Sequence, residues 1–170
     1  FLNDKNEIIE KDFSFLINII SNQEVINIKN INQLFDPSNY LVSPFNSTET
    51  FIKDEYFLTD HQEVIKKEIL ELKTDNEPSF ISIYGAAGTG KTLLTYDIAK
   101  EFIDRGNVII FHCGTLNKGQ RKLIENYSWN IVAIKNLNHH DIESYDFIIV
   151  DEVQRIRKRQ LNFIIGKVKN

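Results

Sequence analysis

The chain has 170 residues, of which 42% are hydrophobic and 26% charged, and its formal net charge is −4. This composition excludes wholesale disorder, and the acidic balance argues against a protein that coats nucleic acid by bulk charge. The single cysteine, Cys113, excludes an internal disulfide and a cysteine-built zinc site. A chain with a single cysteine suits a reducing compartment, so we expect a cytoplasmic protein. No apolar run approaches the roughly 20 residues that span a bilayer, so we expect no membrane partner. The chain starts at Phe1 and has no methionine, which indicates an excised or processed piece.

Residues 1–55 are predicted to be an N-terminal segment of unknown structure, ahead of a core over residues 56–170. Within this segment, residues 13–20 are the strongest candidate for a buried element, and periodicity leaves helix and strand open. Residues 36–50 are rich in turn-forming residues and are typical of a loop or linker.

From residue 57 onward, helical and strand patterns alternate, which predicts βαβ units around a mainly parallel sheet. The first helix of the core has a capping-box pattern, with Thr59 as N-cap and Gln62 three residues later. Thr115 is the expected cap of a later helix, and Gly106 the expected stop of the helix before it. We expect at least four strands, with 80–84 and 147–150 adjacent in the centre. The predicted helices are 59–72, 91–105, 116–127 and 155–168, and the predicted strands are 80–84, 108–112, 131–134 and 147–150.

A phosphate-binding loop pattern follows the first predicted strand, and it reads Gly85-Ala86-Ala87-Gly88-Thr89-Gly90-Lys91-Thr92. Glycines in such a loop let backbone N–H groups converge on a phosphate, helped by the positive end of the following helix. Lys91 adds a positive charge for the β- and γ-phosphates, and Thr92 offers a hydroxyl to Mg²⁺. A glycine-rich turn that binds nothing is the alternative, but the predicted flanking strand and helix favour nucleotide binding.

Two carboxylates, Asp151 and Glu152, follow the apolar strand 147–150. Ligands of parallel α/β sheets bind at the carboxyl ends of the strands. Asp151 is therefore predicted to hold Mg²⁺ through water, and Glu152 to orient and deprotonate the water that attacks ATP. An activating glutamate argues against a nucleotide kinase, which must avoid hydrolysis.

The stretch Asp151-Glu152-Val153-Gln154-Arg155-Ile156 resembles the signature of Schlafen-like DNA/RNA-helicase-type P-loop ATPases, relatives of superfamily 1 helicases. Phe57-Leu58-Thr59-Asp60-His61-Gln62 is similar to the helicase element whose glutamine reads adenine. The resemblance covers about residues 57–165. It implies a RecA-like P-loop NTPase fold, ATP and Mg²⁺ as cofactors, Lys91 and Glu152 as catalytic residues, and single-stranded DNA or RNA as a partner.

Such helicases continue with a strand that senses the γ-phosphate and with a second RecA-like lobe. Because the present chain stops at Asn170, the resemblance implies an incomplete core that needs a C-terminal lobe or a neighbouring subunit. We therefore expect weak hydrolysis from these residues alone.

Several alternatives stay open at this stage. The Gln62 side chain is compatible both with capping the helix and with contacting adenine. The protein is also compatible with a nucleotide-gated regulatory module or an AAA-type ATPase in a defence or signalling protein. The basic residues near the C-terminus serve either a nucleic-acid backbone or a solvated helix face. They are Arg155, Arg157, Lys158 and Arg159.

Overall fold

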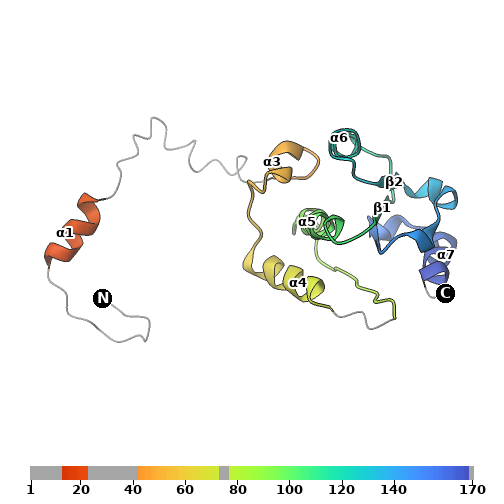
Figure 1. Cartoon of the computed structure of the whole chain (residues 1–170), viewed down its shortest axis with the longest axis horizontal. Coiled ribbons are helices and arrows are strands. Elements are labelled where there is room, and N and C mark those ends of the chain that lie inside the picture. The colour runs from red at the N-terminus through yellow and green to blue at the C-terminus, as the bar shows by residue number, and fades with distance from the viewer. Residues whose placement is uncertain (1–12, 23–41, 73–76, 169–170) are drawn as a thin grey trace. The chain divides into compact units, whose positions relative to one another are not determined.

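The computed structural model describes residues 13–22, 42–72 and 77–168, shown in colour in Figure 1. The chain divides into two compact units, Phe1–Asp36 and Pro37–Asn170. In the first unit the described element is helix α1, Phe13–Ser21, so the segment predicted as helix or strand is a helix. Ile17 and Ile20 on α1 are exposed, unlike the buried element we expected.

The second unit starts at Pro37, so the predicted boundary near residue 55 lies inside it. Helix α3, Thr48–Ile52, replaces part of the predicted loop 36–50. Its Phe51 is fully buried, stacked on Tyr56 with ring centroids 5.3 Å apart and edge-on to Trp129 at 6.0 Å. A buried aromatic side chain removes a large apolar area from water, which explains why this segment joins the core.

The described residues form a mixed α/β structure around a three-stranded parallel sheet (Figure 1). The strands are β1, Val108–His112, β2, Ile131–Ala133, and β3, Phe147–Asp151, in the order β2-β1-β3. Every residue of β1 is buried, as befits a central strand of a parallel sheet covered on both faces. Three of the four predicted strands are therefore confirmed.

The fourth predicted strand, over residues 80–84, does not form. This segment is irregular, and its Phe80 and Tyr84 side chains are 55% and 89% exposed. Among the described residues β3 pairs with β1 alone, so the expected pairing of 80–84 with 147–150 is wrong. The apolar residues of this segment favour an extended backbone. A strand also needs a neighbouring strand that pairs with its backbone N–H and C=O groups.

Helices cover both faces of the sheet. On one face, α5, Lys91–Ile103, and α6, Lys118–Tyr127, pack with α3 against the side chains of Val108 and Ile110. On the other face, α7, Lys158–Val168, packs with two 3₁₀ helices against Ile109 and Phe111. These 3₁₀ helices are η2, Ile134–His139, and η3, Ile142–Ser144. Strand alternation thus sends successive side chains of β1 into two separate hydrophobic clusters.

Helix ends follow local signals in the sequence. Helix α4, Asp60–Leu70, starts with the predicted capping box between Thr59 and Gln62. Helix α6 is capped by Asn117, whose side chain accepts from the Gln120 backbone N–H, so the predicted cap Thr115 is wrong. Among the described residues, no helix combines the length and the apolar character required to cross a membrane.

Candidate functional site

The loop 85–92 connects the irregular segment 80–84 to helix α5. Gly88 and Gly90 have φ values of 79° and 77°, a left-handed conformation that a side chain would strain. Lys91 folds over the loop, where its Nζ donates to the carbonyl oxygens of Gly85 at 2.9 Å and Ala86 at 2.7 Å. The Thr89 hydroxyl also donates to the Ala86 carbonyl, at 2.9 Å, which closes the loop on itself. The ammonium group is thus held on the loop at the N-terminus of a 13-residue helix.

Gln62 joins helix α4 to this loop. Its Oε1 accepts from the Thr59 backbone N–H at 2.8 Å, and its Nε2 donates to the Thr89 carbonyl at 3.1 Å. A Cβ on Gly90 would lie 2.5 Å from Gln62 Nε2, so a side chain there would displace Gln62 from the loop and would also strain the backbone at its φ of 77°. The capping role predicted for Gln62 is confirmed, while the adenine contact stays a prediction.

A buried polar cluster fixes α4 against α5, and the sequence patterns missed it. Asp97 on α5 is buried, accepts a hydrogen bond from the Tyr56 hydroxyl, and pairs with Lys66 Nζ at 2.8 Å. Lys66 also reaches Glu101 at 2.9 Å. Burial and the hydrogen bond to Asp97 both raise the pKa of Tyr56, so this hydroxyl remains a donor. Because α4 carries Gln62, the cluster helps to set where Gln62 meets the loop.

The carboxyl ends of β1 and β3 bring two titratable side chains together. Asp151 is the last residue of β3, and its Oδ2 lies 3.0 Å from Nδ1 of His112, the last residue of β1. Sequence reasoning identified Asp151 and missed His112. The usable signal was parallel register, because both residues end strands that sit side by side.

Glu152 follows Asp151 directly and has a φ of 57°, which is unusual for a residue with a side chain. Its Oε2 accepts from Gln154 Nε2 at 2.6 Å and lies 3.7 Å from Arg155 Nε. These contacts hold the carboxylate at the turn between β3 and the 3₁₀ helix η4, Val153–Arg155. A left-handed residue directly after the end of a strand stores about 1 kcal/mol of strain, a common feature of functional sites.

Helix α5 starts at the loop and packs against the sheet face that carries Asp151. Asp151 lies on the sheet face that α5 covers, since it alternates with Phe147 and Ile149, which pack in the same cluster as Tyr96 of α5. Burial and then the negative charge of Asp151 raise the pKa of Tyr96, one helical turn after Thr92. Among the described residues no direct hydrogen bond or ion pair joins Asp151 to Lys91 or Thr92.

Comparison with known proteins adds no relative. No protein family, curated protein or solved structure matches this chain significantly. What the chain does is therefore inferred from its own residues and their geometry.

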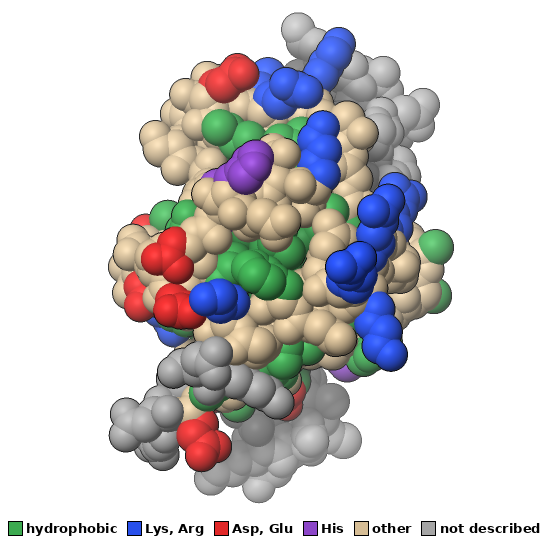
Figure 2. All heavy atoms as spheres, turned by 90° about the vertical axis from the view of Figure 1, so that its right-hand side faces the viewer, with side chains coloured by type: hydrophobic (Ala, Val, Ile, Leu, Met, Phe, Trp, Pro, Cys, Tyr) green, Lys and Arg blue, Asp and Glu red, His purple; other side chains and the backbone are tan. Residues whose placement is uncertain are grey.

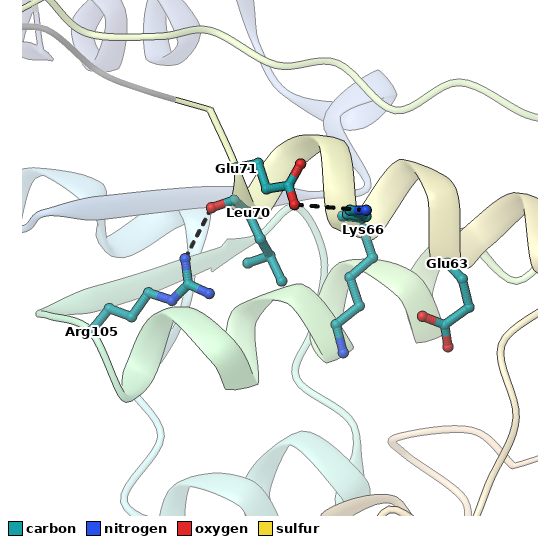
Figure 3. Close-up of a pocket in the computed structure, with 6 residues that line it drawn as sticks. Glu63, Lys66, Leu70, Glu71 and Arg105 are labelled. Atoms are coloured by element: carbon teal, nitrogen blue, oxygen red, sulfur yellow. Dashed lines mark hydrogen bonds and ion pairs between the residues drawn. The ribbon is translucent and has the colours of Figure 1, made fainter.

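A pocket lies along α4 (Figure 3). Its lining residues are Glu63, Lys66, Lys67, Leu70, Glu71 and Arg105, none of them in the loop 85–92. Figure 3 shows Lys66 and Glu63 extending from α4, and Arg105 donating to the Leu70 carbonyl at 3.1 Å. None of the predicted site residues lines it, and its walls carry both signs of charge. The pocket is therefore separate from the candidate site.

Basic side chains gather along one margin of the face seen from the side of α7, with acidic ones on the opposite margin and hydrophobic ones between (Figure 2). The predicted basic residues Arg155, Arg157, Lys158 and Arg159 are all exposed. Arg155 faces Glu152, while no ion pair is formed by Arg157, Lys158 or Arg159 among the described residues. Because these four side chains are exposed, both interpretations remain: contact with a nucleic-acid backbone and a solvated helix face.

Cys113 is expected to be unreactive in the folded protein. Its side chain is buried, and burial followed by the charges of Asp151 and Glu152 raises the pKa of this thiol to about 11. The thiolate is the reactive form, so it is scarce at neutral pH. A thiol reagent at pH 7.5 should label the native chain far more slowly than the chemically denatured chain. Equal labelling rates would contradict this burial.

Proposed function

We propose that this chain binds Mg-ATP through the loop 85–92 and hydrolyses it as a RecA-like P-loop ATPase related to the Schlafen-like helicase group. The observation that carries the proposal is Lys91, whose Nζ lies over the loop within 2.9 Å of two loop carbonyls at the start of α5. A lysine so placed, together with the glycine conformations at positions 88 and 90, supports a triphosphate site at the helix N-terminus.

Lys91 would bind the β- and γ-phosphates by exchanging its two loop carbonyls for phosphate oxygens. The backbone N–H groups of Gly88, Thr89 and Gly90 would surround the β-phosphate, because the left-handed glycines turn successive N–H groups inward. Gln62 braces this loop through the Thr89 carbonyl. In this step the chain would supply a positively charged loop closed by its own hydrogen bonds.

The residues proposed for Mg²⁺ offer suitable donors. Thr92 supplies a hydroxyl from the first turn of α5 and Asp151 a carboxylate, and such hard oxygen ligands suit Mg²⁺. Among the described residues, no three His, Cys, Asp or Glu side chains cluster as a metal site. When bound, Mg²⁺ would neutralise developing charge on the phosphates.

Glu152 is proposed as the general base. One of its carboxylate oxygens is held by Gln154 at 2.6 Å, which leaves the other to take a proton from the attacking water. The exposed basic residues of η4 and α7 support single-stranded DNA or RNA as a partner, and a C-terminal lobe or neighbouring subunit would complete the site. The nucleic-acid partner and the completing lobe or subunit are both part of this proposal.

Calorimetric titration with ATP and a phosphate-release assay test this function. Glu152→Gln is expected to bind ATP as the wild type does while lowering turnover about 100-fold, because a general base contributes that much or more. The matched control is Glu125→Gln, an exposed carboxylate on α6, which should leave both quantities unchanged. Equal turnover in Glu152→Gln and wild type would refute the assignment of Glu152. Binding without any turnover in the wild type would instead favour the nucleotide-gated module.

A further inference from the structure

The strand ends at the candidate site hold an imidazole against the carboxylate proposed for magnesium. His112 and Asp151 are Cα partners in the parallel pairing of β1 and β3. Their residues are only 9% and 8% exposed, and Nδ1 of the imidazole lies 3.0 Å from Oδ2 of the carboxylate. We assign the His112 Nδ1–H as the donor, because an ionised carboxylate only accepts hydrogen bonds.

The backbone around the pair is built to this imidazole. A Cβ on Gly114 would lie 2.9 Å from His112 Nε2 and 3.3 Å from its Cδ2, so a side chain at residue 114 would displace the ring from its present position. The Cys113 backbone N–H donates to the Asp151 carbonyl at 3.0 Å and extends the pairing of the two strands past their ends. The side chain of Asp151 is thus restrained through its own backbone and through His112.

We infer that His112 is a positioning residue for the magnesium ligand Asp151, an inference that rests on the function proposed above. By engaging Oδ2, the imidazole restrains the rotation of the carboxylate, and Oδ1 would remain to contact the hydrated ion. Hydrogen-bond partners of metal-binding side chains typically change metal affinity by about 10- to 100-fold when they are lost. His112 itself touches neither metal nor nucleotide.

The test uses the full chain with three replacements at one position. In His112→Asn the amide nitrogen lies as many bonds from Cα as Nδ1 does, so it can still donate to Asp151. In His112→Gln the amide nitrogen instead matches Nε2, which faces Gly114. His112→Leu removes the donor altogether. Comparing the Asn variant with the Gln variant separates the effect of a hydrogen bond to Asp151 from the effect of any polar side chain at position 112.

The readout is the affinity for a fluorescent ATP analogue, measured in EDTA and again in Mg²⁺, with Mn²⁺ binding followed by electron paramagnetic resonance. The ratio of the two affinities is the magnesium gain. We expect the wild type and His112→Asn to show the full gain, and His112→Gln and His112→Leu to lose about tenfold of it. The affinity in EDTA should be the same for all four chains, because the loop 85–92 is untouched.

Thermal unfolding of each variant shows whether it is folded. If His112→Leu does not fold, the comparison of His112→Asn with His112→Gln still tests the inference. An equal magnesium gain in His112→Gln and the wild type would overturn the inference and leave His112 as a partner that merely satisfies a buried carboxylate. If the wild type bound the analogue neither in EDTA nor in Mg²⁺, the proposed function itself would be overturned, and the inference with it. The two failures are therefore distinguishable.

Discussion

Replacing Lys91 with alanine is expected to lower ATP affinity by at least about 100-fold. The ammonium sits on the loop at the N-terminus of α5, within hydrogen-bond distance of two loop carbonyls. In the proposed complex it would make charge-assisted hydrogen bonds to two phosphates, together worth roughly 3 kcal/mol or more, and each 1.4 kcal/mol is a factor of about ten. Isothermal titration calorimetry with Mg-ATP measures the change directly.

A matched control separates this effect from a general loss of positive charge. Lys67→Ala removes the same charge from α4, where Lys67 is 74% exposed and pairs weakly with Glu71 at 3.9 Å. Its ATP affinity should equal that of the wild type. Both variants should unfold at nearly the wild-type temperature, because neither side chain is buried. Unchanged ATP affinity in Lys91→Ala would sink the proposal that the loop 85–92 binds nucleotide.

Phe51→Ala is expected to destabilise the second unit by about 3–5 kcal/mol, the usual cost of deleting a buried phenyl ring. Phe51 is fully buried, stacks on Tyr56, and contacts Trp129 edge-on. It also lies under Lys100, whose Nζ is 5.6 Å from the ring centroid. Urea denaturation of the full chain, followed by tryptophan fluorescence, reports this loss at Trp129.

The control for Phe51 lies six positions later in the same segment. Phe57 is 83% exposed, so Phe57→Ala should change the free energy of unfolding by no more than about 0.5 kcal/mol. The contrast tests where the folding unit starts. Equal stability of Phe51→Ala and the wild type would mean that residues 42–55 are not part of the core.

Local signals were enough for many helix and strand boundaries. The capping box at Thr59 and the apolar run that forms β1 are confirmed because each depends on neighbours within a few residues. The glycines of the loop were also identified correctly as positions of special backbone geometry, with left-handed angles at Gly88 and Gly90. The Asn117 cap was missed because Thr115, two residues earlier, satisfied the same local rule.

Long-range pairing was less predictable. The apolar residues of 80–84 have strand propensity, yet the segment forms no strand, since a strand exists only where a neighbour supplies hydrogen bonds. Similarly, α3 lies in a turn-rich stretch, and only the burial of Phe51 against distant rings shows that it belongs to the core. Secondary-structure propensity is a property of one segment, whereas strand pairing and side-chain burial depend on a second segment that packs against it.

From its amino-acid sequence alone, this protein was predicted to have an alternating α/β core, a loop suited to phosphate at residues 85–92, and carboxylates at the end of β3. These features depend on residue type and local spacing, which a linear pattern records. Only the tertiary structure placed His112 beside Asp151, brought Gln62 onto the loop, and buried Asp97 between Lys66 and Tyr56. Those contacts join residues 27 to 41 positions apart in the sequence. They arise from strand register and helix packing, which no local pattern encodes.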